Sequence, residues 1–129
     1  MQTSDVTDHI SQRFNQDLDD LRNSVLTIGG LVETQLSKAI AAVVNGDSEL
    51  GLKVANDDYK VNNLEVNIDE ECSRILATRA PAASELRLIV AIIKTITDLE
   101  RIGDEAEKIG LLASKLAAMD RPADSYREL

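Results

Sequence analysis

The chain has 129 residues and a formal net charge of −9, and its residues are 43% hydrophobic, 29% charged and 2% aromatic. This composition excludes a disordered chain and favours one all-α domain with a core of Leu, Ile, Val and Ala. The negative charge argues against nucleic-acid partners, because phosphate backbones repel such a surface, and it favours cations or basic partners.

The first predicted helix covers residues 10–44. Its apolar residues recur at spacings of three and four, which is the pattern of one buried helical face. That face comprises Phe14, Leu18, Leu21, Val25, Ile28, Val32, Leu36, Ala39, Ile40 and Val43. A Gly29-Gly30 pair inside the helix is unfavourable by about 1 kcal/mol per glycine relative to alanine, so we expect a close helix contact or a local bend there.

The second predicted helix covers residues 47–78. Gly46 suits the left-handed cap position that ends the first helix, and Asp47 or Ser48 can cap the second. The expected buried face comprises Leu50, Val54, Val61, Leu64, Ile68, Cys72 and Ile75. Cys72 is the only cysteine, and we interpret it as a thiol of the core.

The third predicted helix covers residues 84–118, after Pro81 has ended the second helix, and Ser84 is its expected N-cap. Its expected buried face comprises Leu99, Ile102, Ala106, Ile109, Ala113 and Leu116. Because two short connections force neighbouring helices to be antiparallel, residues 1–129 are predicted to form a single up-down-up three-helix bundle. No apolar run reaches the roughly 20 residues that span a bilayer, and no targeting core is visible, so we expect a cytoplasmic protein without membrane insertion.

A line of acidic residues interrupts the apolar pattern of the third helix. Ile89 and Ile93 are followed along one helical face by Glu100, Asp104 and Glu107. The second helix carries a matching line, which comprises Asp58, Asn62, Glu65 and Asp69. Both helices therefore present a Glu-x-x-x-Asp pair, and like charges at this spacing repel one another. Such oxygen ligands favour a hard cation such as iron, manganese, magnesium or calcium, and zinc less characteristically.

Simpler interpretations of these acids stay open. Asp104 can pair with Lys108 on its own helix, or Arg101 can neutralise the acids across the bundle. Catalytic groups are scarce, because His9 is the only histidine and the Glu-x-x-His motif of di-iron bundles is absent. No glycine-rich phosphate loop and no phosphate pocket with convergent donors is evident. We therefore expect no enzymatic activity.

Four segments resemble the PhoU family of phosphate-transport regulators, and the likeness covers essentially all 129 residues. They are GGLVE at 29–33, DYKVNNLE at 58–65, IDEE at 68–71 and DLERIGD at 98–104. The resemblance implies a cytoplasmic all-helical protein built from two similar three-helix bundles, of which this chain is the first repeat, the N-terminal half of a longer protein. In some members of the family, Glu/Asp-x-x-x-Asp motifs hold clusters of iron or zinc.

The resemblance also implies a function. PhoU proteins couple a phosphate-specific ABC transporter to a sensor histidine kinase and repress the phosphate-starvation regulon when phosphate is plentiful. They have no accepted catalytic activity, and they often form homodimers. A bundle without its partner bundle is expected to expose apolar residues such as Ile93 and Leu111, which self-association would cover.

The metal ligands that the resemblance implies are carried over residue by residue, for iron, zinc or another divalent cation. In order of expectation they are Glu100 and Asp104, then Asp58, Glu65 and Asp69, then Asn62 and Asp98. Asn62 departs from the family pattern, which often has an acid at that position. Two other functions stay open: a magnesium-dependent all-α nucleotide pyrophosphohydrolase, which also uses paired acids, and a helical interaction module without metal.

Overall fold

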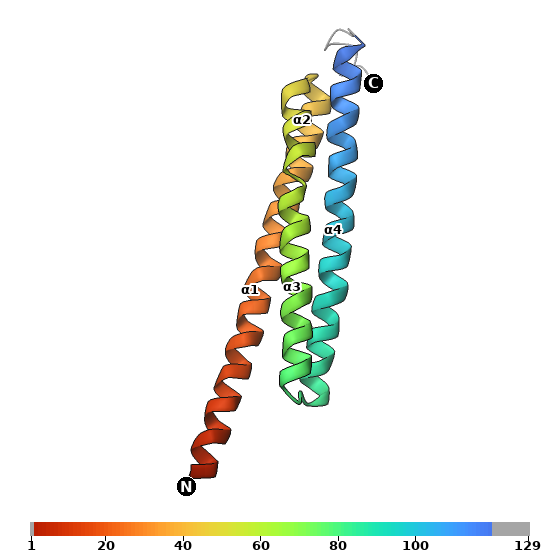
Figure 1. Ribbon diagram of the computed structural model, residues 1–129. Helices are drawn as coiled ribbons and strands as arrows, with labels where there is room; N and C mark the ends of the chain where they lie inside the picture. The colour runs from red at the N-terminus through yellow and green to blue at the C-terminus, as the bar shows by residue number, and fades with distance from the viewer. Residues whose placement is uncertain (1, 120–129) are drawn as a thin grey trace.

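The computed structural model describes residues 2–119, with side chains from residue 12 onward, as an elongated bundle of α-helices. The helices are α1 (Gln2–Asn45), α2 (Ser48–Asp57), α3 (Tyr59–Thr78) and α4 (Ala83–Ala118). As Figure 1 shows, α2 and α3 follow one another along a single rod, so that the molecule consists of three antiparallel rods. The predicted all-α, up-down-up three-helix bundle is confirmed. Within residues 2–119, no helix is both long and apolar enough to cross a membrane.

Large and small side chains divide the core along the length of the bundle. The larger cluster lies where α3 packs between α1 and α4, and its buried members are Phe14, Leu18, Leu21, Ile28, Val32, Val61, Ile68, Cys72, Ile75, Ile89, Ile92 and Ile96. A second cluster, beside α2, consists of Ala39, Val54 and Ala106. Small residues let the rods approach one another closely at the α2 end. The acidic residues lie between the two clusters.

Two glycines allow the close approach of α2 and α4. A Cβ atom at Gly110 would lie 2.6 Å from the carbonyl oxygen of Gly51, and a Cβ at Gly51 would collide with the carbonyl oxygen of Gly110. Gly29 and Gly30 have open space around their Cβ positions, and α1 continues through both of them. Of the two alternatives expected at Gly29-Gly30, a close helix contact or a local bend, the close contact is therefore wrong. The contact that requires glycine lies on the other two helices.

The helix ends agree with the sequence in part. Gly46 has a φ of 65°, and Asp47 caps α2 by accepting a hydrogen bond of 3.0 Å from the backbone N–H of Leu50, as predicted. The expected cap at Ser84 is wrong, because α4 begins before it. Glu85 instead reaches back and accepts a 3.0 Å hydrogen bond from the backbone N–H of Ala82.

The single helix predicted over residues 47–78 is interrupted at Asp58. The N–H of Asp58 donates to the carbonyl of Ala55 at 3.4 Å, and the N–H of Val61 donates to the carbonyl of Asp58 at 3.1 Å. Both bonds span three residues instead of four, which tightens the backbone locally. The side chain of Asp58 is buried at this junction.

The buried faces of α1 and α4 are rotated slightly from the predicted ones. Ile40 is 51% exposed and Ile102 is 42% exposed, although both were expected in the core. On α4 the buried positions are Ile89, Ile92, Ile96, Gly103, Ala106, Gly110 and Ala113. Glycines occupy the centre of the contact face, and a pattern based on apolar side chains overlooks them.

Three further expectations concern single residues. Cys72 is a free, buried thiol, as predicted, and burial together with the nearby Asp69 and Glu71 raises its pKa to about 11. Leu111 is exposed, as expected of a bundle with an uncovered apolar face. Ile93, expected to be exposed, packs against the large core cluster instead, because α4 turns that position toward its neighbours.

Candidate metal centre

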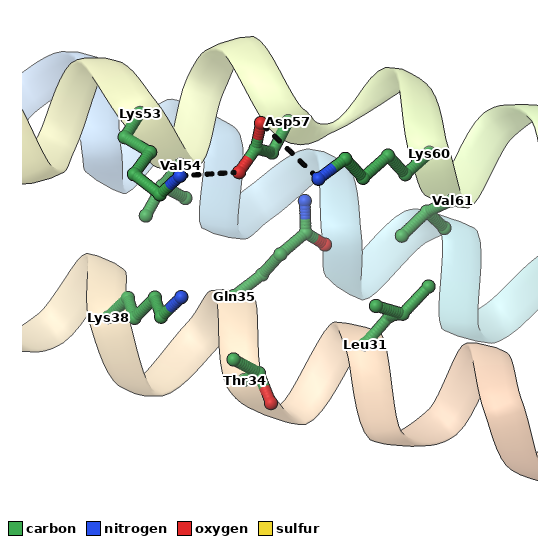
Figure 2. A pocket seen from close by; sticks show the side chains of 9 residues that line it. All are labelled: Leu31, Thr34, Gln35, Lys38, Lys53, Val54, Asp57, Lys60 and Val61. Carbon is green, nitrogen blue, oxygen red and sulfur yellow. Dashed lines mark ion pairs between the residues drawn. The ribbon is translucent and has the colours of Figure 1, made fainter.

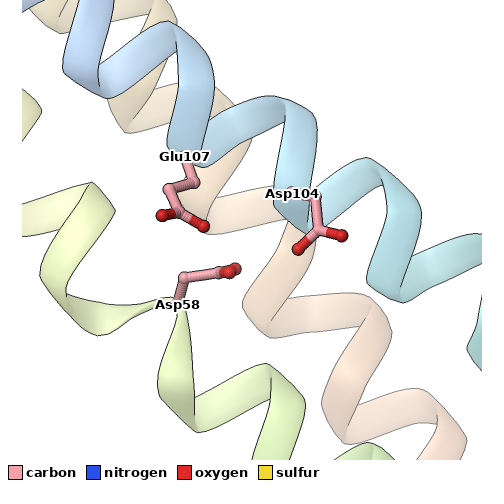
Figure 3. A group of neighbouring side chains, drawn as sticks. All are labelled: Asp58, Asp104 and Glu107. Atoms are coloured by element: carbon pink, nitrogen blue, oxygen red, sulfur yellow. The ribbon is translucent and has the colours of Figure 1, made fainter.

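Three carboxylates converge where the α2–α3 junction faces α4 (Figure 3). Asp58 comes from the junction, and Asp104 and Glu107 come from one face of α4, three residues apart. One oxygen atom from each of them lies within 4.8 Å of the other two. Asp58 is only 4% exposed, and the other two side chains are half-buried. We call these three residues the acidic cluster.

Because Gly103 has no side chain, the side chains of Asp58 and Gln35 can approach the backbone of α4 closely. A Cβ atom at this position would lie 3.3 Å from Oδ1 of Asp58 and 3.3 Å from Oε1 of Gln35. Gln35, on α1, is buried, and its Nε2 donates a hydrogen bond of 3.3 Å to Oδ1 of Asp58. Its Oε1 is buried without a hydrogen-bond partner. The side-chain amide of Gln35 therefore orients the carboxylate of Asp58 toward α4.

Two more glutamates extend the negative charge along α3 and α4, and we call Glu65 and Glu100 the flanking glutamates. Burial raises the pKa of Glu65, and repulsion from Asp69 and Asp104 raises it further. Burial also raises the pKa of Glu100, as do the charges of Glu65 and Asp104. The charges of Glu65, Glu100 and Asp104 therefore act on one another between α3 and α4, whereas Asp69 acts on Glu65 along α3.

Asp58 has the largest effect on the pKa of Glu107. A hydrogen bond between their side chains raises the pKa of Glu107, and burial raises it as well. A carboxyl group can donate this bond only when it is protonated. The carboxyl group of Glu107 thus holds its proton more tightly than an isolated glutamate does.

No basic side chain among residues 12–119 forms an ion pair with a member of the acidic cluster or with a flanking glutamate. Lys108 pairs with Glu105 at 3.2 Å, and Arg101 pairs with Asp98 at 3.9 Å on the exposed side of α4. Neither simpler interpretation of the acids therefore describes this structure. The charge of Lys108 also acts on Glu107, but it does not outweigh the effects that raise the pKa of that carboxyl group.

The structure brings some of the expected ligands together and leaves others apart. Asp58 and Asp104 belong to the acidic cluster, and Glu65 and Glu100 flank it. Asn62 and Asp69 are exposed on α3, although the charge of Asp69 still acts on Glu65. The side chain of Asp98 is 72% exposed and is occupied by Arg101.

Two residues of the site were absent from the expected ligand set. Glu107 continues the acidic line of α4, three residues after Asp104, and this spacing was a usable signal. Gln35 lies three residues after Val32 and four before Ala39, where the buried face of α1 requires an apolar side chain. A polar residue at such a position indicates a buried hydrogen-bond partner.

The donor set fits a divalent cation. Carboxylate oxygens are the ligands of hard cations such as Mg²⁺, Ca²⁺ and Mn²⁺, and they also bind iron, whereas zinc more often takes nitrogen or sulfur ligands. The buried Oε1 of Gln35, beside Gly103 and Asp58, is a further neutral oxygen without a partner. A cation at the acidic cluster would neutralise its charge and tie the α2–α3 junction to α4.

The chain is similar in sequence to a known domain family and to characterised proteins. Residues 25–113 match the sequence profile of the PhoU domain. The chain is 49% identical over 124 residues to the phosphate-specific transport system accessory protein PhoU homolog of Pseudomonas aeruginosa, an alignment that covers 96% of the chain and 51% of that protein. It is 52% identical over 109 residues to the phosphate-specific transport system accessory protein PhoU of Escherichia coli K12, covering 84% of the chain and 45% of that protein.

The same relationship holds in three dimensions. The crystal structure of PhoU from Pseudomonas aeruginosa superimposes with a TM-score of 0.80 at 47% sequence identity, over 89% of this chain and 56% of that one. The chain thus spans about half the length of the curated relatives that it matches.

Proposed function

The chain belongs to the PhoU domain family, and from this premise we propose that it is one three-helix bundle of a non-enzymatic regulator of phosphate uptake. The observation that carries the proposal is the match of residues 25–113 to the PhoU domain, supported by relatives named as accessory proteins of phosphate-specific transport. Since the chain spans about half of those relatives, the regulator would contain a second bundle of the same kind.

The regulator would act in the cytoplasm by contact between proteins. In this proposal, helical faces of the bundle bind a phosphate-specific ABC transporter and a sensor histidine kinase, and the complex represses phosphate-starvation genes when phosphate is plentiful. An acidic protein with a net charge of −9 favours basic surfaces on such partners. Among the described residues, the long exposed faces of α1 and α4 offer the extended surfaces that such contacts need.

We assign to the acidic cluster a structural or regulatory divalent cation, with iron, manganese or magnesium as the first candidates and zinc as another. Asp58, Asp104 and Glu107 would be the ligands, with the flanking glutamates and Asp69 as neighbours. The uncompensated charge of the cluster and the unpartnered oxygen of Gln35 support this assignment. The cation would bridge two rods, and it would therefore set how rigidly the α2–α3 junction is held against α4.

The regulatory function is tested by deletion of the native gene and complementation. Deletion is expected to switch on phosphate-starvation genes in phosphate-rich medium, and the full-length parent gene is expected to restore repression. A deletion strain with unchanged repression would overturn the proposal. Hydrolysis of nucleotides by the purified protein with Mg²⁺ or Mn²⁺ would overturn its non-enzymatic part.

The bundle is also proposed to associate as a homodimer. Several large apolar side chains are exposed, among them Leu26 at 73% and Leu112 at 49%. A shallow apolar groove between α1 and α4, lined by Val25, Leu26 and Leu88, adds to this surface. Contiguous exposed apolar surface commonly marks a contact with another protein chain. Light scattering at high concentration tests the proposal, and a monomer under these conditions would contradict it.

A further inference from the structure

A small open cavity lies on the other side of the α2–α3 junction, facing α1 (Figure 2). Its volume is about 110 Å³, and its apolar floor is formed by Leu31, Val54 and Val61. Three of the six lysines in the chain line this cavity, Lys38 from α1, Lys53 from α2 and Lys60 from α3. We call this cavity the lysine pocket. Such a concentration of positive charge is unexpected in a chain with a net charge of −9.

Asp57 forms ion pairs with two of these lysines. Nζ of Lys53 lies 3.6 Å from Oδ2 of Asp57, and Nζ of Lys60 lies 3.8 Å from Oδ1 (Figure 2). Tight charge-assisted hydrogen bonds between such groups measure about 2.7–2.9 Å. Both ammonium groups are therefore held near Asp57 with N–H donors to spare, since each carries three.

The third lysine has no such partner. Lys38 lies on the opposite wall of the pocket, and within residues 12–119 it forms no ion pair. The pocket therefore holds two more positive charges than negative ones. Lys53 and Lys60 come from the α2–α3 rod and Lys38 comes from α1, so the donors lie on two opposite walls of the cavity.

We propose that the lysine pocket binds inorganic phosphate as the hydrogen phosphate dianion. The cavity has room for several water molecules, and hence for one tetrahedral oxyanion. Lys38, Lys53 and Lys60 would donate to the three unprotonated oxygens, and the P–OH group would donate to the carboxylate of Asp57. No spacing in the sequence predicts this group of lysines, because the packing of α1 against α2 and α3 brings them together.

Asp57 makes the pocket selective for phosphate over sulfate. A carboxylate can accept the proton of hydrogen phosphate, whereas sulfate carries no proton and would meet Asp57 as a bare negative charge. A site that forms a hydrogen bond with a ligand hydroxyl discriminates strongly against an analogue that lacks it. The three lysines are exposed, and without a carboxylate among them they would bind both dianions alike, so the selectivity depends on Asp57.

The two neighbouring aspartates at the junction serve different surfaces. Asp57 faces the lysine pocket, whereas Asp58 faces the acidic cluster on α4, and the buried side chain of Gln35 lies between the two sites. The phosphate proposal rests on the pocket alone. It stands or falls independently of the regulatory function and of the metal.

Isothermal titration calorimetry of the purified chain with phosphate and with sulfate, in mildly alkaline buffer, tests the proposal. The parent is expected to bind phosphate about tenfold or more tightly than sulfate, which corresponds to one charge-assisted hydrogen bond. Lys38→Gln is expected to weaken phosphate binding by about tenfold or more. The matched control is Lys94→Gln, an exposed lysine of α4 outside the pocket, and it should leave phosphate binding unchanged.

Asp57→Asn separates selective binding from simple charge attraction. If Asp57 accepts the phosphate proton, this variant loses its preference for phosphate and binds sulfate more tightly than the parent does. Three results would overturn the proposal: no phosphate binding to the parent, an equal loss in Lys38→Gln and Lys94→Gln, or equal gains for phosphate and sulfate in Asp57→Asn. Circular dichroism of each variant establishes that the helices are retained.

Discussion

The close contact between α2 and α4 gives a sharp prediction, because glycine is required there by space and not by backbone conformation. In Gly110→Ala, the new Cβ would lie 2.6 Å from the backbone oxygen of Gly51, and the two helices would have to separate by about 0.8 Å to reach the 3.4 Å of ordinary contact. A backbone atom cannot move aside as the end of a flexible side chain can. The whole of α2 must therefore shift.

The expected magnitude follows from two opposing terms. Replacing glycine by alanine within a helix favours folding by about 0.5–1 kcal/mol. Overpacking a close contact opposes it by about 1–3 kcal/mol. We expect Gly110→Ala to lower the free energy of unfolding by about 1–2 kcal/mol, which corresponds to a fall in Tm of roughly 3–10 °C for a domain of this size.

Gly30→Ala is the matched control. Gly30 is exposed within α1, and nothing lies within 4 Å of its Cβ position, so only the favourable helix term applies. This variant is expected to raise the free energy of unfolding by about 0.5–1 kcal/mol. Urea denaturation followed by circular dichroism measures both variants. If Gly110→Ala proved as stable as Gly30→Ala, the close contact between α2 and α4 would be refuted.

Three further predictions concern charge and reactivity. The double variant Asp58→Asn, Asp104→Asn should retain less divalent metal by elemental analysis than the control Asp98→Asn, and equal metal contents would contradict the assignment. Because Glu107 and the flanking glutamates have raised pKa values, the metal-free folded chain binds more protons than the unfolded one, and its stability should fall as the pH rises through and above the ordinary glutamate range. Thermal melts in a chelator at acidic and neutral pH measure this slope, which added divalent metal should flatten by occupying the carboxylates. Cys72, with its buried thiol and a pKa of about 11, should react with a thiol reagent only slowly at neutral pH until urea unfolds the chain, and rapid labelling of the native chain would show that the thiol is accessible.

Both candidate sites of this bundle, the lysine pocket and the acidic cluster, lie at the junction between α2 and α3. It places two adjacent aspartates on opposite sides of one rod, one against α1 and its lysine, the other against α4 and its carboxylates. A regular helix that continued through Asp58 would have four-residue hydrogen bonds throughout. The hydrogen bonds donated by Asp58 and Val61 span three residues instead, and they mark the interruption between α2 and α3.

The sequence by itself determined the helices, their order and the lines of acidic residues on the second and third rods. These properties depend on spacings of three and four within one helix, on caps such as Gly46 and Asp47, and on short connections, all of which are local in the chain. The resemblance to the PhoU family also gave Asp58 and Asp104 as expected ligands, and the structure brings these two together.

Only the tertiary structure decided which acids meet most closely and which polar residues support them. Glu107 joined the cluster in place of Asp98 because Gly103 and Gly110, and not Ile102, occupy the contact face of α4, which rotates that helix relative to its apolar pattern. Gln35 and Lys38 reach their sites from α1, which precedes the junction by about twenty residues in sequence. Such placements depend on how closely the rods approach and in which register, and these are set by contacts between backbones that no spacing within a single helix encodes.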